Sequence, residues 1–280
     1  MKYFKTGRIS LFFLFFILAL NNLLFSISNK IEDIRDQDLS ITANNPMGRT
    51  WVVFIENSNY EIFPRLDGPV KDFASIQKAL ANYQIHNIIH KKDMTKAEME
   101  RFFNIDLRDL VKLNKVNSLL IWYAGHGKFI NDIGYWIPVD ASRDNEFSYF
   151  SINILKVALN GYEDSVTHTL VVSDASESGP GFYSAMRMVY DNPKCDNTVI
   201  AGAKSAQVFS SAGYEQALDN SKFTATFANT LLNNRDACIP IETIVKYVTS
   251  AVSTETGQRP KFGKIQGMED LNGTFFFMAK

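Results

Sequence analysis

Residues 118–127 read SLLIWYAGHG, an apolar run that ends in a histidine between two glycines. The run Ser118–Ala124 is typical of a strand that is buried on both faces of a parallel sheet. His126 follows it in an open, Gly-rich turn, where an imidazole can reach a substrate proton as a general base must. A surface histidine in a plain turn is the alternative, and this stretch alone leaves both open.

The chain around this strand alternates between strand and helix patterns. Strands are predicted at residues 50–56, 85–89, 118–124, 167–173, 198–203 and 274–278, and helices at 69–83, 95–112, 152–160, 223–233 and 241–252. Such alternation is typical of βαβ units, in which helices cover both faces of a mainly parallel central sheet. We therefore expect an α/β fold, a three-layer α-β-α sandwich. Its chemistry should lie beyond the carboxyl ends of the strands.

The composition indicates an ordinary globular protein. Of the 280 residues, 46% are hydrophobic and 21% are charged, which excludes disorder, collagen and coiled coil. The 29 basic and 30 acidic side chains nearly cancel, so nucleic acid is not an expected partner. Cys195 and Cys238, the only cysteines, are too few for a disulfide framework, and a single bridge and two buried free thiols both remain open.

The first 28 residues are predicted to be a secretory signal peptide. Basic residues precede the apolar block Leu11–Leu20, and Ser26-Ile27-Ser28 supplies the small residues of a cleavage site. We expect export to the periplasm or the extracellular space. The alternative is an uncleaved membrane anchor through residues 9–28, but the apolar block is short for a span of about 20 residues. Residues 29–49 are a polar lead-in, and no linker breaks residues 50–280, which we expect to form one domain.

A second polar loop follows the strand predicted at 167–173. It reads Ser173-Asp174-Ala175-Ser176-Glu177-Ser178-Gly179, and Ser176 lies 50 residues after His126. Caspases have a comparable spacing between their catalytic histidine and cysteine. With these two loops, and with Tyr135–Asp140 (YWIPVD), the chain resembles the caspase-like cysteine peptidases, closest to the bacterial caspase-domain and metacaspase branch.

The resemblance implies the caspase-like form of the sandwich and a peptidase that acts on peptides or proteins without a cofactor. His126 would be the base and position 176 the nucleophile, and the N–H groups of Gly127 and residue 176 would form the oxyanion hole. Asp174 stands where metacaspase-like relatives also have Asp, and we expect it to bind a basic substrate residue. Asp72 is a second candidate acid. The alternatives are a turn residue for Asp174 and a helix-surface residue for Asp72.

The nucleophile position departs from the family, because it holds Ser176 instead of cysteine. A serine hydroxyl is far less acidic than a thiol and needs a well-oriented base. Three interpretations follow: a non-catalytic protein that binds a peptide or partner, a weak Ser-His peptidase, or a variant of a chain that naturally has cysteine. We expect impaired catalysis in the chain as written.

Other chemistries lack their motifs. No Gly-x-Ser-x-Gly elbow, dinucleotide fingerprint or phosphate-binding Gly-Lys-Ser/Thr loop occurs. His86 and His90 are four residues apart on a predicted strand, which separates them by about 13 Å. No metal site is therefore expected there.

Overall fold

The computed structural model describes residues 20–28, 30, 45–162, 164–175, 182–186, 193–212 and 221–280. The chain divides into two compact units, residues 1–45 and residues 46–280. In the first unit, residues 20–28 are helical and expose apolar side chains such as Leu24 and Phe25. In the part of the chain that is described, no helix combines the length and the hydropathy that a membrane crossing requires.

The second unit is built on a central sheet. Within the described residues, seven strands pair in the order β2-β1-β3-β7-β9-β11-β8. The first five are parallel to one another, whereas β11 and β8 add antiparallel pairs at one edge. The strands are β1 (Thr50–Glu56), β2 (Asn87–Lys92), β3 (Ser118–Gly125), β7 (His168–Ala175), β8 (Tyr183–Met186), β9 (Ser205–Ser210) and β11 (Lys261–Ile265). The predicted mainly parallel sheet is confirmed.

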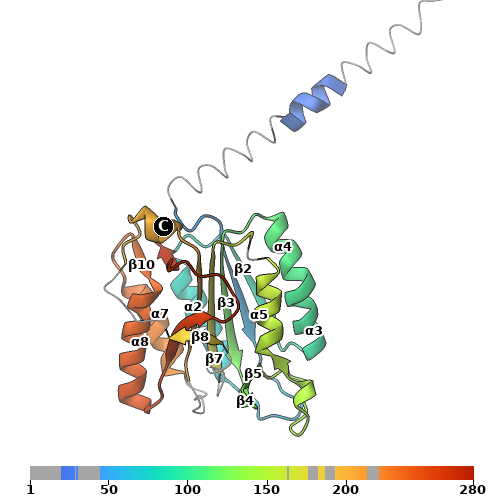
Figure 1. The fold of residues 1–280 in the computed structure, drawn as a ribbon, viewed down its shortest axis with the longest axis vertical. Helices are drawn as coiled ribbons and strands as arrows, with labels where there is room; N and C mark the ends of the chain where they lie inside the picture. The colour runs from blue at the N-terminus through green and yellow to red at the C-terminus, as the bar shows by residue number, and fades with distance from the viewer. Residues whose placement is uncertain are drawn as a thin grey trace, which may run out of the picture. The chain divides into compact units, whose positions relative to one another are not determined.

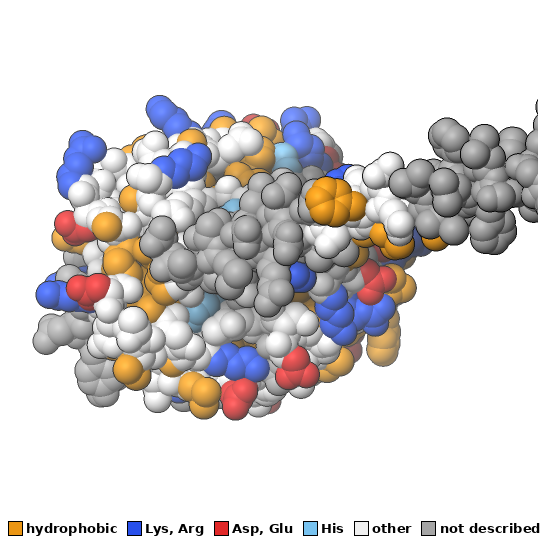
Figure 2. Space-filling view, turned by 90° about the horizontal axis from the view of Figure 1, so that it is seen from above, with side chains coloured by type: hydrophobic (Ala, Val, Ile, Leu, Met, Phe, Trp, Pro, Cys, Tyr) orange, Lys and Arg blue, Asp and Glu red, His pale blue; other side chains and the backbone are white. Residues whose placement is uncertain are grey.

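Helices cover both faces of this sheet and make it the middle of three layers (Figure 1). One face packs against α2 (Gly68–Leu80), α7 (Lys222–Asn233) and α8 (Ile241–Thr256). The other packs against α3 (Lys96–Arg101), α4 (Leu107–Leu113) and α5 (Ile152–Asn160). Alternate residues of β1 and β3 point into the two cores, as the pleat of a doubly covered strand requires. Charged side chains of both signs are interspersed on the face that Figure 2 shows.

Two small sheets flank the central one. The antiparallel strands β4 (Gly127–Ile130), β5 (Ile133–Trp136) and β6 (Phe150–Ser151) follow the histidine turn. Strands β10 (Cys238–Pro240) and β12 (Phe276–Met278) form an antiparallel pair elsewhere. The single-turn η2 (Glu146–Ser148) precedes β6.

Several predicted elements differ from the observed ones. The segment predicted as a strand at 198–203 is the short helix α6 (Thr198–Gly202), because the Asn197 side chain caps the N–H groups of Val199 and Ile200. The predicted helix at 95–112 begins at the expected Thr95–Glu98 capping box but is interrupted by a π-helical turn, η1 (Phe102–Asp106). The strand predicted at 85–89 lies instead at Asn87–Lys92.

The two cysteines form a disulfide. Cys195 and Cys238 are bonded, so the alternative of two free thiols is wrong. The bond joins the segment before α6 to β10, across a sequence separation of 43 residues.

Candidate functional site

The strands β3 and β7, which precede the two chemically interesting loops, end side by side. They are parallel neighbours, and Gly125 of β3 pairs with Ala175 of β7. In the sequence, His126 follows Gly125 and Ser176 follows Ala175. Ser176 itself lies outside the described residues. The register therefore places the ends of the two strands together at the carboxyl edge, where parallel sheets have their sites.

The His126 ring is held by a backbone carbonyl. Its Nε2 lies 2.8 Å from the oxygen of Pro64. Because a carbonyl oxygen can only accept, Nε2 must carry the proton, so Nδ1 is the basic nitrogen of the neutral ring. The rings of Tyr60 and Phe63, with centroids 4.7 and 5.8 Å from that of His126, pack beside it. The Pro64 carbonyl and these two aromatic rings orient the imidazole.

The backbone of His126 is held by two phenols. Its N–H donates to the Tyr60 hydroxyl at 2.8 Å, and the Tyr123 hydroxyl donates to its carbonyl at 2.8 Å. Burial raises the pKa of both tyrosines above the ordinary value. A Cβ on Gly125 would lie 2.6 Å from the Tyr60 hydroxyl and 2.7 Å from that of Tyr123. The first glycine of the Gly-His-Gly turn is therefore required by this close approach.

Gly127 begins the small sheet that follows His126. It is buried and pairs with Trp136 across β4 and β5. The Ile137 N–H donates to the His126 carbonyl at 3.0 Å, and the Trp136 indole N–H donates to Ser173 Oγ at 3.0 Å. These bonds fasten the turn to both β5 and β7. They fix the backbone on either side of the proposed base.

Asp174 is buried near the end of strand β7. Its Oδ2 accepts hydrogen bonds from the Ser221 hydroxyl and, at 2.6 Å, from that of Thr224, at the start of α7. Burial raises the pKa of its carboxyl, and hydroxyl donors oppose that shift. The turn-residue alternative for Asp174 is wrong, because the residue lies within a strand and its side chain bonds to hydroxyls distant in sequence.

Asp72 lies on α2, which begins in the loop after β1 and so starts at the same carboxyl edge of the sheet. Its side chain is half-buried. The next residue, Phe73, stacks on His90 with ring centroids 3.5 Å apart. A place on the first turns of α2 is compatible with either role predicted for Asp72.

The other histidines are bonded to protein groups. His86 Nδ1 accepts from the Thr50 N–H at 3.0 Å, and His90 Nε2 is 2.8 Å from Glu56 Oε2. His168 is buried at the start of β7, with Nδ1 3.0 Å from Ser205 Oγ. Among the residues that the structure describes, no three His, Cys, Asp or Glu side chains are grouped so that they could hold a metal ion.

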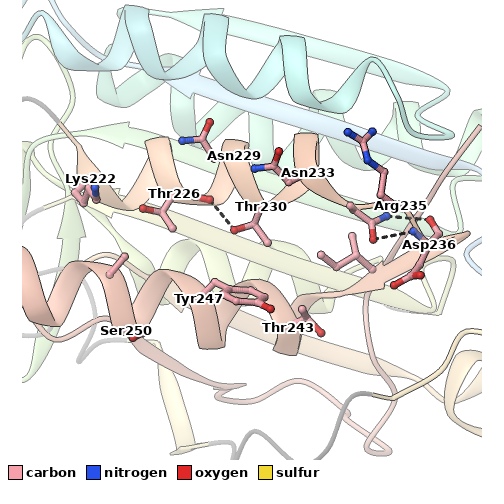
Figure 3. Close-up of a pocket in the computed structure, with 13 residues that line it drawn as sticks. Lys222, Thr226, Asn229, Thr230, Asn233, Arg235, Asp236, Thr243, Tyr247 and Ser250 are labelled. Carbon is pink, nitrogen blue, oxygen red and sulfur yellow. Dashed lines mark hydrogen bonds between the residues drawn. The ribbon is translucent and has the colours of Figure 1, made fainter.

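A separate hollow of about 790 Å³ lies between α7 and α8 (Figure 3). Neutral polar side chains line its length, with Lys222 at one end and Arg235 and Asp236 at the other. Lys222 is paired with Glu255 at 2.8 Å. The hollow contains none of the predicted site residues and no titratable base between its ends.

The sequence did not reveal the groups that hold His126. The Pro64 carbonyl is a backbone atom, which no residue pattern announces. Tyr60 lies in the loop after the first predicted strand, where no pattern indicates a contact with His126, and Tyr123 fits the pattern of a core residue of its strand. In the sequence, only Gly125 indicates that other groups approach the turn closely.

The family is shown by comparison with known proteins. The model of the caspase domain, a peptidase family, matches residues 49–269. The fold resembles the crystal structure of caspase-1 from Spodoptera frugiperda with a TM-score of 0.53 and 14% identity, covering 80% of this chain and 94% of that chain. No curated protein matches in sequence. Caspase-like peptidases act on proteins or peptides. This chain belongs to the caspase-domain family of peptidases.

Proposed function

We propose that this protein is an exported caspase-domain protein whose site is built for endopeptide hydrolysis, with His126 as the base and position 176 as the nucleophile. The observation that carries the proposal is the Nε2–H···O=C bond from His126 to Pro64, because it leaves Nδ1 as the proton acceptor. The parallel register of Gly125 and Ala175 supports the pairing of the two loops.

The reaction follows from these roles. His126 Nδ1 takes the proton of the nucleophile at position 176 as that atom attacks the substrate carbonyl carbon. The N–H groups of Gly127 and residue 176 would stabilise the negative oxygen of the tetrahedral intermediate. The protonated imidazole then gives its proton to the leaving amine, and water releases the acyl group in a second round. The chain supplies all of these groups without a cofactor.

Serine makes the first step slow. A thiol with a pKa near 8.5 is readily ionised beside an imidazole, whereas a hydroxyl needs a base that a carboxylate usually orients. Here the contact that orients Nε2 is a neutral carbonyl. We therefore expect the chain as written to be catalytically impaired, with the base and its support intact.

The second candidate function is binding without catalysis. Ser176 itself favours it, because a peptidase site with a poor nucleophile can hold a peptide or partner without cutting it. A weak Ser-His peptidase would be intermediate between full hydrolysis and binding without catalysis.

The test compares Ser176→Cys with Ser176→Cys/His126→Ala on a peptide library. We expect the single variant to gain endopeptidase activity and the double variant to lose it. If folded Ser176→Cys cuts nothing while the Ser176 form binds peptides, the binding function is correct and the proposed hydrolysis is wrong.

We propose a preference for Arg or Lys immediately before the cleaved or bound position. The support is the buried Asp174 carboxyl at the carboxyl edge of the sheet, whose ionised form would repel an acidic substrate residue and attract a basic one. Arginine can also pair with it through two N–H groups. Asp72 is the second acid in this proposal. An unchanged Arg preference after Asp174→Ala, or a preference for Asp in the unmodified site, would overturn it.

Export is proposed from the leader, with cleavage after Ser28. The Cys195–Cys238 disulfide supports it, because such bonds persist in oxidising compartments. N-terminal sequencing of the exported protein should begin at Asn29. Recovery of the full-length chain from the membrane fraction would instead indicate an anchor through residues 9–28.

A further inference from the structure

Two phenols hold the backbone of His126. The Tyr60 hydroxyl accepts from its N–H, and the Tyr123 hydroxyl donates to its carbonyl, each at 2.8 Å. Tyr60 comes from the loop after β1, which is distant in sequence, whereas Tyr123 lies near the end of β3, just before the turn. We refer to these two residues as the tyrosine clamp.

The direction of each bond in the clamp is fixed by chemistry. An amide N–H can only donate, so the Tyr60 oxygen accepts from His126. A carbonyl can only accept, so the Tyr123 proton points to the His126 oxygen at 2.8 Å, shared with that of Ile137 at 3.1 Å. The two bonds therefore hold His126 at both its N–H and its carbonyl.

We infer that Tyr60 and Tyr123 are positioning residues, whose hydrogen bonds fix the His126 backbone so that Nε2–H meets the Pro64 carbonyl and Nδ1 remains the base. The inference rests on the proposed role of His126. The N–H and the C=O of His126 belong to the two peptide groups on either side of its Cα. Holding both groups limits rotation about φ and ψ, and the direction in which the imidazole leaves the backbone is fixed with them.

The surroundings keep the clamp neutral and in place. Burial is the main cause of the raised pKa of each tyrosine, so both hydroxyls remain protonated donors at neutral pH. The Tyr123 ring stacks on Trp136, with centroids 4.4 Å apart. The hydroxyls occupy the space that a Cβ at residue 125 would take, so only glycine fits at that position.

The loop that carries Tyr60 has supports of its own. Asp93 Oδ1 accepts from the N–H groups of Ser58 and Asn59, each at 2.8 Å. The Asn57 side chain accepts from the Met94 N–H at 2.9 Å and donates to the Ile137 carbonyl at 3.1 Å. Removing one phenolic hydroxyl should therefore remove one hydrogen bond to His126 without releasing the loop.

The test uses the full chain with Ser176 and three variants: Tyr60→Phe, Tyr123→Phe and the control Tyr162→Phe. Tyr162 is also buried, but its hydroxyl has no hydrogen-bond partner among the described residues, so its removal should change nothing at His126. Nitrogen-15 NMR reports which ring nitrogen of His126 carries the proton. Loss of a hydrogen bond worth about 1 kcal/mol should raise the ratio of Nδ1–H to Nε2–H form about fivefold in each clamp variant.

A second readout uses the same substitutions in the Ser176→Cys protein. We expect kcat to fall about fivefold in the clamp variants with KM unchanged, and neither to change in Tyr162→Phe. If Ser176→Cys is inactive, the proposed hydrolysis fails, while the NMR measurement still tests the clamp. The inference is wrong if the two clamp variants have the same tautomer ratio as the control Tyr162→Phe. It is also wrong if the ratio changes equally in all three variants.

Discussion

Acidification should destabilise this protein through His168. The residue is 1% exposed, and burial lowers the pKa of its imidazole to about 4. The unfolded chain, with an ordinary pKa near 6.5, binds the proton first as the pH falls. At a pH between these two pKa values, proton binding therefore stabilises the unfolded state relative to the folded state. The stability that the folded protein gains from a neutral His168 is complete above about pH 6.5 and is lost as the pH falls toward about 4.

The magnitude follows from the two pKa values. Proton linkage gives a loss of about 2 kcal/mol at pH 5 and about 3 kcal/mol at pH 4, relative to a protein without this histidine. The matched comparison is His168→Gln, which keeps a polar side chain beside Ser205 but does not titrate. Asp174 and the other acids titrate in both proteins, so their contributions cancel in the difference.

The assay is urea unfolding at a series of pH values from 7 to 4, followed by the fluorescence of the buried tryptophans Trp51, Trp122 and Trp136. The difference in unfolding free energy between the two proteins should shift in favour of His168→Gln as the pH falls. A difference that is constant across this range would refute a neutral, buried His168.

Two further predictions concern stability. Gly125→Ala should lower the free energy of unfolding by about 1–3 kcal/mol, because its Cβ would overlap both clamp hydroxyls. The control Gly202→Ala, with nothing within 4 Å of the added Cβ, should not change it. Equal urea midpoints for the two variants would contradict the close approach at Gly125. Replacing both Cys195 and Cys238 by serine should lower the unfolding free energy by about 4 kcal/mol, the chain-entropy value for a sequence separation of 43 residues. If the oxidised wild type unfolds at the same urea concentration as this variant, the disulfide does not stabilise the fold.

The regular periods of the sequence predicted most of the fold. The buried strand at Thr50–Glu56 and the helix at Ile152–Asn160 lie where the apolar patterns placed them. Those elements bury one clear face or both, so hydrophobic periodicity alone specifies them.

The errors occur where polar side chains decide the structure. The central strand β9 was missed because its buried residues include Ser205, Gln207 and Ser210. Gln207 is satisfied there by Glu242 at 3.0 Å and by the Phe275 N–H at 3.0 Å, partners that no local pattern reveals. In α6, the single side chain of Asn197 outweighs the strand preference of the β-branched residues that follow it.

The candidate site divides in the same way. His126 could be predicted, because a glycine-flanked histidine after a buried strand is visible in the sequence. Its orientation could not, because it depends on the Pro64 carbonyl and the Tyr60 hydroxyl, which are distant in sequence, and on the Tyr123 hydroxyl of the preceding strand. Asp174 was expected in the polar loop that follows the predicted strand but lies at the end of β7, held by α7.

The most direct test of the proposed site is covalent labelling of Ser176→Cys with a peptidyl acyloxymethyl ketone that ends in arginine. This reagent alkylates a thiolate that an adjacent imidazole has activated, and mass spectrometry locates the adduct. We predict one adduct, at position 176, that His126→Ala abolishes and Tyr162→Phe does not. Labelling that proceeds equally well without His126, or no labelling of the folded protein, would contradict the assignment of His126 as the base of a peptidase site.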